Sequence, residues 1–319
     1  MKFLITGGAG FIGSHLADEL LLRGNQIVAL DDLSTGSLRN IAHHRDNKDF
    51  QFIQGSVLDE RLVNEAVADA DFIFHLAAAV GVNLIMEKPL ESLKTNIHGT
   101  ENVLNSANQF GKKVLLTSTS EIYGKCQDFP LKEDGDRVLG CPQKIRWSYS
   151  TAKAVDEVMA YLYWKEKKIP TIIVRLFNTV GPRQTGAYGM VLPRFIKQAL
   201  NNEDITIYGD GTQTRCFTYV KDVVNALIEL INCPMAVGNV YNIGSQEEIS
   251  IKELAERVIK ATGCSSKIVF IPYQNAYAEG YEDMARRLPS IEKIASAIGY
   301  APTMKINDII NKLIESQIT

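Results

Sequence analysis

Tyr149 and Lys153 are four residues apart, a spacing that places both side chains on one face of a helix. A tyrosine phenol has a pKa of about 10 and is a poor base at neutral pH. An ammonium group one helical turn away, together with the cationic ring of a bound ligand, would favour the phenolate and lower the pKa of Tyr149, which would make the tyrosine a general base. The same spacing occurs in ordinary helices, where the tyrosine packs and the lysine is solvated, so the pair needs support from other motifs.

A glycine-rich turn occupies residues 6–13, after a short apolar run in residues 1–5. Gly7, Gly10 and Gly13 stand three apart there. In a strand, turn and helix unit the first glycine permits a tight turn, the second lets a pyrophosphate approach, and the third lets the helix pack closely on the strand. Phosphates then lie at the helix N-terminus, where N–H groups and the helix dipole favour an anion. A tight turn without a ligand has the same pattern, which leaves both interpretations open.

A second apolar run, residues 26–30, ends in a pair of carboxylates. Asp31 follows Gly13 by 18 residues, about where a carboxylate accepts both ribose hydroxyls of an adenosine. Asp31 and Asp32 would also repel a 2′-phosphate. The sequence therefore predicts a site for NAD rather than NADP.

Strand and helix patterns alternate through the first half of the chain. Strands are predicted at residues 50–54, 71–76 and 113–117, and helices at residues 59–68 and 89–110. This alternation implies right-handed crossovers and predicts an α/β fold with a Rossmann-type doubly wound parallel sheet. Ligands of such sheets gather at the carboxyl ends of the strands.

Two of these strands end in residues suited to a ligand. Residues 77–79 are three alanines, which let a flat ring approach the backbone or simply pack closely. Residues 117–121 read Thr-Ser-Thr-Ser-Glu and bring four hydroxyls and a carboxylate to another strand end. Some of these hydroxyls are expected to cap a turn, and the rest to face a substrate.

The regular alternation stops after a strand predicted at residues 171–177. We therefore expect a smaller α/β C-terminal substrate domain that begins near Asn178. Residues 217–243 look like a return to the first domain. The predicted division assigns residues 1–177 and about 217–243 to a NAD-binding Rossmann domain, and residues 178–216 and about 244–319 to the substrate domain.

The helix pattern of residues 155–168 is apolar on both faces and includes Tyr161 and Trp164. Such a helix can pack between its own sheet and a second subunit. The pattern supports the hypothesis of a homodimer.

The chain has 319 residues, 45% of them hydrophobic and 22% charged, with a formal net charge of −3. This balance, without a dense basic run, gives no sign of nucleic-acid or membrane affinity. Five scattered cysteines include no C-x-x-C pair, so we expect reduced thiols in a cytoplasmic protein, with no metal site and no disulfide. No stretch approaches the roughly 18 apolar residues of a membrane span.

Together these motifs resemble the extended short-chain dehydrogenase/reductase superfamily, and within it the nucleotide-sugar branch. The resemblance covers nearly the whole chain. It is carried by residues 6–13, Asp31, residues 75–78, Thr119, Tyr149 with Lys153, residues 177–183, residues 208–211 with Arg215, and residues 287–289. It implies an enzyme whose NAD is reduced and reoxidised in each turnover, with a 4-keto sugar in between.

The resemblance also implies a role for each site residue. Tyr149 would remove the proton of a sugar C4 hydroxyl, Thr119 would hydrogen-bond that hydroxyl, and Lys153 would bind the nicotinamide ribose. The cofactor site would comprise Gly7, Gly10, Phe11, Ile12, Gly13, Asp31, Asp32, Ser56, Val57, Leu76, Ala77, Ala78, Thr117, Tyr149 and Lys153. The nucleotide sugar, UDP-linked by the same resemblance, would meet Ser120, Asn178, Arg183, Val191, Tyr208, Gln213, Arg215 and Arg287.

Three reactions can follow from a 4-keto sugar: 4-epimerisation, 4,6-dehydration and, where C6 is a carboxylate, loss of CO2 from a β-keto acid. Glu121 resembles the acid of decarboxylases and of some dehydratases, and it suits proton transfer at C5. Arg146, and Arg287 within residues 279–291, resemble arginines of the uronate decarboxylases that lie near the uronate carboxylate or aid protonation. The implied catalytic set is Thr119, Glu121, Arg146, Tyr149, Lys153 and Arg287, with UDP-glucuronate decarboxylation favoured over 4-epimerisation and 4,6-dehydration.

Several alternatives stay open. Arg146 could instead form a surface or interface salt bridge, and Arg287 could contact the pyrophosphate. Ser56 stands where relatives usually carry the aspartate that binds the adenine amino group, and residues 184–190 differ from the substrate loop of UDP-xylose synthases. A non-enzymatic dinucleotide sensor is disfavoured, because such regulators tend to lose the tyrosine or the lysine.

Overall fold

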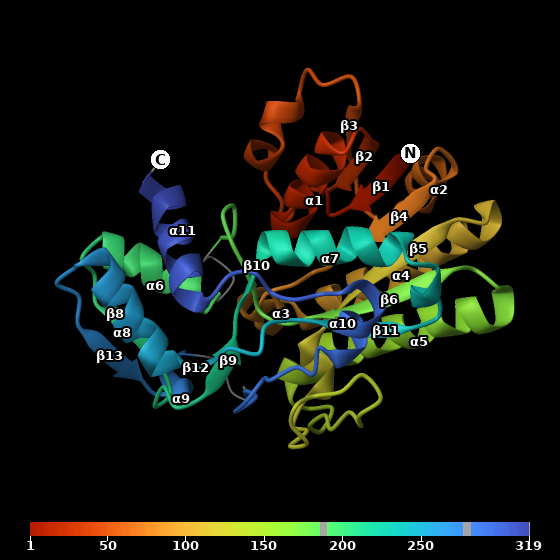
Figure 1. Cartoon of the computed structure of the whole chain (residues 1–319). Coiled ribbons are helices and arrows are strands. Elements are labelled where there is room, and N and C mark those ends of the chain that lie inside the picture. Colours follow the sequence, from red (N-terminus) through yellow and green to blue (C-terminus); the bar gives the residue numbers. More distant parts are fainter. Residues whose placement is uncertain (186–189, 277–281, 319) are drawn as a thin grey trace.

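The computed structural model describes residues 1–185, 190–276 and 282–318. Its core is a sheet of seven strands, and a smaller group of helices and strands lies to one side, at the left of Figure 1. The sheet strands are β1 (Lys2–Thr6), β2 (Gln26–Asp31), β3 (Phe50–Gln54), β4 (Phe72–His75), β5 (Lys113–Thr119), β6 (Thr171–Leu176) and β11 (Val240–Ile243).

All neighbouring strands in this sheet are parallel, in the order β11-β6-β5-β4-β1-β2-β3. The central strands are buried on both faces, since Leu4, Ile5, Ile73 and Leu115 are all 0% exposed. The strand order reverses between β1 and β4, which opens a crevice for ligands at the carboxyl ends. The predicted doubly wound parallel sheet is therefore confirmed.

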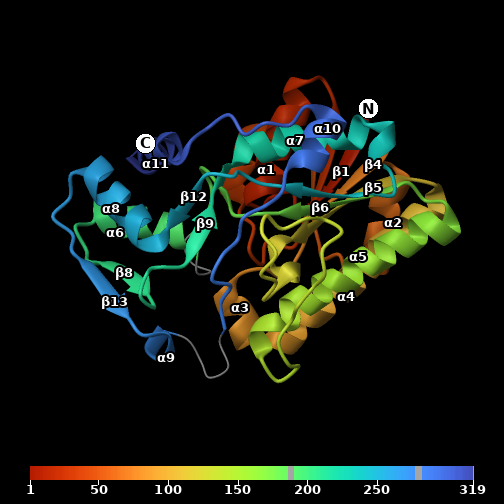
Figure 2. The same cartoon turned by 60° about the horizontal axis from the view of Figure 1, so that its bottom comes forward.

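Helices cover both faces of the sheet (Figure 2). α1 (Phe11–Leu22), α7 (Val220–Asn232) and α10 (Glu292–Ile298) lie on one face, and α2 (Glu60–Ala68), α4 (Pro89–Phe110) and α5 (Ser148–Lys167) lie on the other. Each face has its own hydrophobic core. α4 begins with Pro89 in its first turn and ends at Gly111, whose φ is 63°, which is why its sequence limits could be predicted.

The smaller region combines short strands with amphipathic helices. Strands β8 (Ile205–Tyr208) and β13 (Ile268–Ile271) pair in parallel, and β9 (Thr214–Cys216) and β12 (Glu248–Ser250) pair antiparallel. The helices are α6 (Val191–Leu200), α8 (Ile251–Thr262), α9 (Tyr273–Ala276) and α11 (Ile306–Ile318). Ser250 caps α8 by accepting the backbone N–H of Glu253.

Short elements join the two regions. β7 (Thr179–Val180) and β10 (Thr218–Tyr219) pair with each other rather than with the large sheet, so the return to the sheet begins with α7. α10 packs on α7 and β11 although it lies within residues 244–319, and the division into domains stays a prediction. The remaining elements are α3 (Val82–Glu87) and the 3-10 helices η1 (Leu38–Asn40), η2 (Ala42–His44), η3 (Ser120–Tyr123), η4 (Ile145–Trp147) and η5 (Pro234–Ala236).

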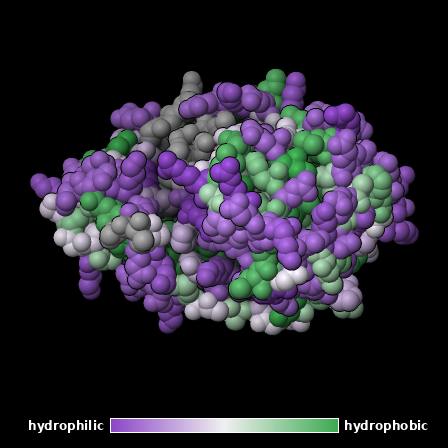
Figure 3. Space-filling view, turned by 90° about the horizontal axis from the view of Figure 1, so that it is seen from above, coloured by the Kyte–Doolittle hydropathy of each residue, from purple (hydrophilic) through white to green (hydrophobic). Residues whose placement is uncertain are grey.

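The face of the molecule in Figure 3 is mostly hydrophilic, with hydrophobic side chains in scattered groups. Among the helices of the described ranges, none is long and apolar enough to cross a membrane. All five cysteines are free thiols in the structure.

Candidate active site

A cavity of about 760 Å³ lies at the carboxyl ends of the sheet strands and is lined by residues of both regions. The predicted site residues on its wall are Gly7, Gly10, Phe11, Ile12, Asp31, Asp32, Val57, Leu76, Ala77, Ala78, Thr117, Thr119, Ser120, Glu121, Arg146, Tyr149, Asn178, Arg183, Val191, Tyr208, Gln213, Arg215 and Arg287. Gly13, Ser56 and Lys153 are the predicted residues that do not line it. The fold thus gathers most of the expected site in one place.

The glycine turn joins β1 to α1 at one end of this cavity. Gly7 has a φ of 72°, in the left-handed region that favours glycine. A Cβ on Gly13 would lie 2.1 Å from the carbonyl oxygen of Gly7, so only glycine lets the helix start so close to the turn. No side chain caps the first turn of α1, whose N–H groups suit a phosphate.

Asp31 is buried at the end of β2, on the cavity wall. Its carboxylate accepts hydrogen bonds from the backbone N–H groups of Ala9 (3.0 Å) and Leu33 (2.8 Å). Burial raises the pKa of Asp31, and these N–H groups oppose that rise. The cavity is also lined by Ser34, Thr35, Ser37 and Asn40, which were not predicted, although the polar run directly after the two aspartates was an available signal.

Ser56 was expected in the cofactor site but lies outside the cavity wall. Its hydroxyl accepts a hydrogen bond from the backbone N–H of Leu58 at 3.3 Å. Val57 lines the cavity instead. The structure therefore gives no support to an adenine contact through the Ser56 side chain.

Tyr149 and Lys153 both lie on α5, and Tyr149 lines the cavity. Lys153 is 2% exposed, and its ammonium donates a hydrogen bond to the carboxylate of Asp156 at 2.8 Å. Burial raises the pKa of Tyr149 above its usual range, and the negative charges of Glu121 and Asp156 add to that rise. Without a bound ligand the pKa of Tyr149 is therefore raised, mainly by burial, and its lowering by Lys153 together with a cationic ring stays a prediction.

Some hydroxyls at the end of β5 form hydrogen bonds within the chain, and others can still bind a ligand. Thr117 donates to the carbonyl of His75 at 3.0 Å, and Thr119 accepts the N–H of Glu121 at 3.2 Å. The Thr119 hydroxyl can still donate its own proton to a ligand. Ser118 lines the cavity, and its buried hydroxyl has no hydrogen-bond partner within the described ranges. Ser118 is thus one of the hydroxyls in this run that can face a ligand, although it was not predicted individually.

Glu121 is clamped by a buried arginine. Arg146, from η4, donates two hydrogen bonds to its carboxylate, at 2.5 Å and 2.6 Å. Arg146 is 1% exposed, so a surface or interface salt bridge is excluded. Burial raises the pKa of Glu121, but the guanidinium groups of Arg146 and Arg287 outweigh burial and lower the pKa to about 2. Glu121 is therefore ionised at neutral pH.

Arg287 is held more loosely than Arg146. Its ion pairs with Glu121 and Asp283 are both 3.4 Å long, and its buried Nε has no hydrogen-bond partner in the part of the chain that the structure describes. Arg215 contacts the other oxygen of Asp283 at 2.8 Å. Of the two arginines on Glu121, Arg287 is thus the one that can turn to a new anion.

Tyr208 and Arg194 form a stacked pair on the cavity wall. The Arg194 guanidinium lies 4.2 Å from the centroid of the Tyr208 ring, and Gln213 donates its side-chain amide to the Tyr208 carbonyl at 3.0 Å. A ring covered by a guanidinium suits the base or phosphates of a nucleotide. The sequence analysis missed Arg194, Tyr273 and Asp283 on this wall. Arg194 lies three residues after the predicted Val191, on the same helix, which was a usable signal.

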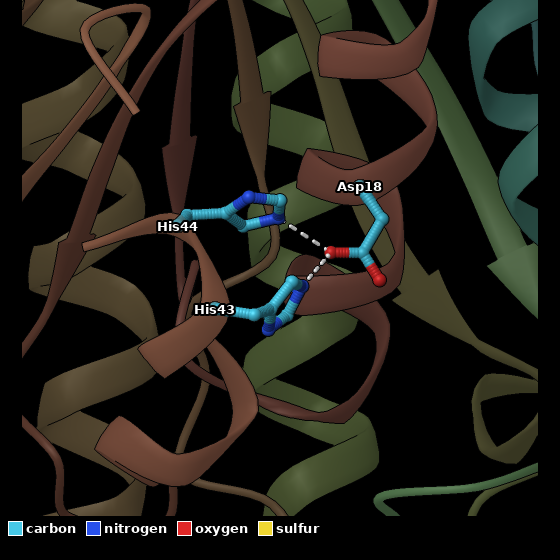
Figure 4. A group of neighbouring side chains, drawn as sticks. All are labelled: Asp18, His43 and His44. Carbon is cyan, nitrogen blue, oxygen red and sulfur yellow. Dashed lines mark hydrogen bonds and ion pairs between the residues drawn. The ribbon is translucent and has the colours of Figure 1, made fainter. Parts of the chain in front are cut away.

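Arg183 reaches the cavity from a backbone with a φ of 67°. Asp18 of α1 forms an ion pair with it at 2.8 Å. The same carboxylate accepts hydrogen bonds from the imidazoles of His43 (2.8 Å) and His44 (2.7 Å), as Figure 4 shows. Burial raises the pKa of Asp18, but these donors outweigh burial and lower it.

The ligand atoms of Asp18, His43 and His44 lie within 4.8 Å of one another, close enough to hold a metal ion. Hydrogen bonds and the Arg183 ion pair account for this group without an ion. The predicted absence of a metal site stays a prediction.

Two expectations fall partly outside the described residues. They concern the loop at residues 184–190, of which residues 186–189 are not described, and the segment at residues 279–291, of which residues 279–281 are not described.

The sequence matches the family model described as GDP-mannose 4,6 dehydratase over residues 4–313. The UDP-N-acetyl-alpha-D-glucosaminuronate decarboxylase of Bacillus cytotoxicus is 43% identical to it, over 95% of this chain and 93% of that protein. UDP-glucuronic acid decarboxylase 1 of Danio rerio is 37% identical, over 98% of this chain and 72% of that protein.

Solved structures of related enzymes share the fold. The UDP-glucuronic acid 4-epimerase of Bacillus cereus, solved with UDP-glucuronic acid and NAD, has a TM-score of 0.90 at 30% identity and covers 100% of both chains. The dTDP-glucose 4,6-dehydratase of Bacillus anthracis, solved with NAD, has a TM-score of 0.87 at 25% identity, over 100% of this chain and 96% of that one. These proteins are enzymes of nucleotide sugars, which confirms an enzyme rather than a dinucleotide sensor. The chain therefore belongs to the GDP-mannose 4,6-dehydratase family, within the extended short-chain dehydrogenase/reductase superfamily that its motifs resemble.

Proposed function

We propose that this chain is an NAD-dependent decarboxylase of a UDP-linked hexuronate. The observation that carries the proposal is the charge balance of one cluster on the cavity wall, formed by Arg146, Arg215, Arg287, Glu121 and Asp283. Three guanidinium groups face two carboxylates, which leaves one positive charge. A uronate carboxylate on the sugar would balance that charge, whereas the hexose ring of UDP-glucose brings no charge of its own to this cluster.

The opposite end of the cavity fits NAD. The turn that Gly7 and Gly13 make possible supports the pyrophosphate assignment, and the buried Asp31 carboxylate supports the ribose assignment. When bound there, NAD would accept a hydride from C4 of the sugar and return it later in the turnover. We assign residues 1–177 and about 217–243 to this cofactor, and residues 178–216 and about 244–319 to the nucleotide sugar.

Tyr149 and Thr119 are the proposed contacts of the sugar C4 hydroxyl. Both line the cavity, and Thr119 keeps a proton to donate. Tyr149 takes the hydroxyl proton as C4 is oxidised and returns it when C4 is reduced. Lys153 holds the nicotinamide ribose in this proposal, through the donors that Asp156 does not use.

Loss of CO2 follows from the ketone at C4. The C6 carboxylate is then part of a β-keto acid, and the ketone accepts the electron pair of the breaking C5–C6 bond. Arg287 orients the carboxylate, because its present ion pairs are long, while Arg146 stays on Glu121. A water molecule must then give a proton to C5 and leave as hydroxide, and Glu121, which is ionised and lines the cavity, is the group that we assign to orient that water.

The relatives point to two hexuronates, glucuronate and its 2-acetamido counterpart. We would incubate the protein with NAD and, separately, with UDP-glucuronate, UDP-N-acetylglucosaminuronate and UDP-glucose, and analyse the products by mass spectrometry and proton NMR. Loss of CO2 from a uronate supports the proposal and identifies the sugar. An unchanged mass with an inverted C4 would establish 4-epimerisation instead, the activity in the name of the Bacillus cereus neighbour.

The proposal includes a homodimer. α5 lies next to α4 and leaves hydrophobic side chains exposed, Val155, Val158, Tyr161 and Leu162, which are 37–47% exposed. A second copy of the same helices would cover them. Sedimentation over a range of concentrations tests this, and a monomer mass throughout would exclude it. The unpaired cysteines support a cytoplasmic location.

A further inference from the structure

Trp147 connects two segments that supply arginines to the cavity. It follows Arg146 directly in η4, and its indole N–H donates a hydrogen bond to the carboxylate of Glu282 at 2.9 Å. Glu282 precedes Asp283, and the same segment continues to Arg287. The part of the cavity wall that the structure describes includes neither Trp147 nor Glu282, so this hydrogen bond lies behind the wall rather than in it.

The hydrogen bond between Trp147 and Glu282 has a site shaped for it. Trp147 is 3% exposed. A Cβ on Gly140 would lie 2.4 Å from the indole nitrogen and 3.2 Å from the Glu282 carboxylate, so the glycine leaves room for the two groups to meet. Lys125 forms an ion pair with the same carboxylate oxygen at 2.6 Å. The hydrogen bonds from Lys125 and Trp147 lower the pKa of Glu282, so the acceptor is ionised at neutral pH.

Both neighbours of Asp283 in the chain are held near Trp147. Glu282 accepts the indole N–H, and Met284 is 3% exposed and belongs to the same hydrophobic cluster as Trp147. Asp283 then places a carboxylate oxygen 3.4 Å from a guanidinium nitrogen of Arg287. A shift of the indole would therefore move Asp283 and, through it, Arg287.

The rest of this segment is held by backbone hydrogen bonds. The N–H of Thr214 donates to the carbonyl of Ala285 at 2.9 Å, and the N–H of Leu131 donates to the carbonyl of Leu288 at 2.8 Å. These bonds do not depend on a particular side chain, whereas the bond between Trp147 and Glu282 does. A substitution can therefore remove that bond and leave the backbone anchors in place.

We propose that Trp147 is a positioning residue, which through Glu282 holds Arg287 where its guanidinium selects a nucleotide sugar with a carboxylate at C6. This inference rests on the proposed function, in which Arg287 orients the uronate carboxylate. Pairing of a guanidinium with a carboxylate depends on direction as well as distance. Loss of the indole hydrogen bond should therefore weaken binding of a uronate more than binding of the same sugar with a C6 hydroxyl.

Trp147→Phe tests this role because it removes the indole N–H and keeps an aromatic ring in the cluster. The quantity to measure is the selectivity, defined as the Kd of UDP-glucose divided by the Kd of UDP-glucuronate, or the same ratio for the 2-acetamido pair. Calorimetry with NAD present gives both constants, and a Tyr149→Phe parent protein prevents turnover during the titration. We expect Trp147→Phe to lower the selectivity about tenfold, the scale of a weakened hydrogen bond between charged groups.

Two substitutions of Glu282 form a matched pair. Glu282→Gln keeps an oxygen that can accept the indole N–H, so the selectivity should stay within about threefold of the parent. Glu282→Leu has no acceptor and should repeat the loss of about tenfold. Arg286→Gln is the control on the same segment, since the exposed Arg286 pairs with Glu248 at 2.8 Å instead, and it should leave the selectivity unchanged.

A selectivity within about twofold of the parent in Trp147→Phe and Glu282→Leu would overturn the inference. Equal losses of affinity for both sugars would also overturn it, because they indicate a general structural role. If Trp147→Phe does not fold, Glu282→Leu decides, since the Glu282 side chain is 27% exposed. A parent protein that binds the neutral sugar as tightly as the uronate would instead refute the carboxylate recognition of the proposed function, a failure visible before any substitution at Trp147 or Glu282.

Discussion

The two ends of the cavity are built in different ways. The end with the glycine turn depends on backbone geometry within a few residues, since Gly13 must avoid the carbonyl of Gly7. The end with Glu121 depends on side-chain charges brought together from distant segments, with Arg146 25 residues and Arg287 166 residues away. A substitution at the first end should therefore act through a steric clash, and a substitution at the second end through the loss of an ion pair.

The largest effect is expected at Tyr149, which lines the cavity. Tyr149→Phe removes the hydroxyl but keeps the ring, so it should lower kcat by about 1,000-fold or more while NAD still binds. Steady-state kinetics and calorimetry measure the two quantities. Activity within about tenfold of wild type would rule out Tyr149 as the base.

Gly13→Ala should damage the glycine end alone. The added Cβ would lie 2.1 Å from the Gly7 carbonyl oxygen, so the turn must shift, and NAD affinity should fall by about 100-fold or more. Gly24→Ala is the control for a glycine outside the site, since its Cβ would meet no atom within 4 Å; its φ of 75° makes a small loss of stability the expected result. Equal NAD affinities in the two variants would contradict the steric argument.

The contribution of the Glu121 ion pairs to the stability of the fold should depend on pH. The pKa of Glu121 is lowered from 4.5 to about 2 in the folded chain, so its contribution is present above about pH 4.5 and is lost as the pH falls through about 2. That contribution is of the order of 3 kcal/mol. Urea unfolding at several pH values should show a steeper acid loss in wild type than in Glu121→Gln. Parallel curves would contradict the role of the arginines.

The same variant tests the chemistry at this end. Glu121→Gln should slow the steps after C4 oxidation by about 30-fold, because the carboxylate proposed to orient the water is lost, and reduced nicotinamide should accumulate during turnover. Stopped-flow absorbance measures that accumulation. If only substrate binding weakens and no reduced cofactor appears, Glu121 has a structural role.

The smallest effect is expected for the group that holds Arg183 from outside the cavity. Asp18→Asn removes the ion pair with Arg183 and should raise KM for the nucleotide sugar by about fivefold, with kcat nearly unchanged. His43→Ala keeps that ion pair and is the control. A larger loss in His43→Ala than in Asp18→Asn would show that the histidines, rather than Arg183, explain the cluster.

The local features of the fold were predictable from the chain itself. The glycine turn, the position of Asp31 and the limits of α4 depend on residues close together in the sequence, whose steric and capping preferences act locally. The resemblance predicted that Tyr208, Arg215 and Arg287 belong to one site, and all three line the cavity. Arg194 and Asp156 were missed, because no motif contains them, and Ser118 was not singled out within the run of residues 117–121.

The sequence alone predicted the parallel sheet and the glycine turn at one end of the cavity, since periodicity and turn geometry act over a few residues, and its motifs resembled those of the family. Only the tertiary structure decided which charged side chains form ion pairs. It paired Arg146 with Glu121 and Lys153 with Asp156, and it buried Tyr149, which raises the pKa of that phenol. The physical reason is that burial and ion pairing depend on distances between side chains in space, which their spacing along the chain does not fix.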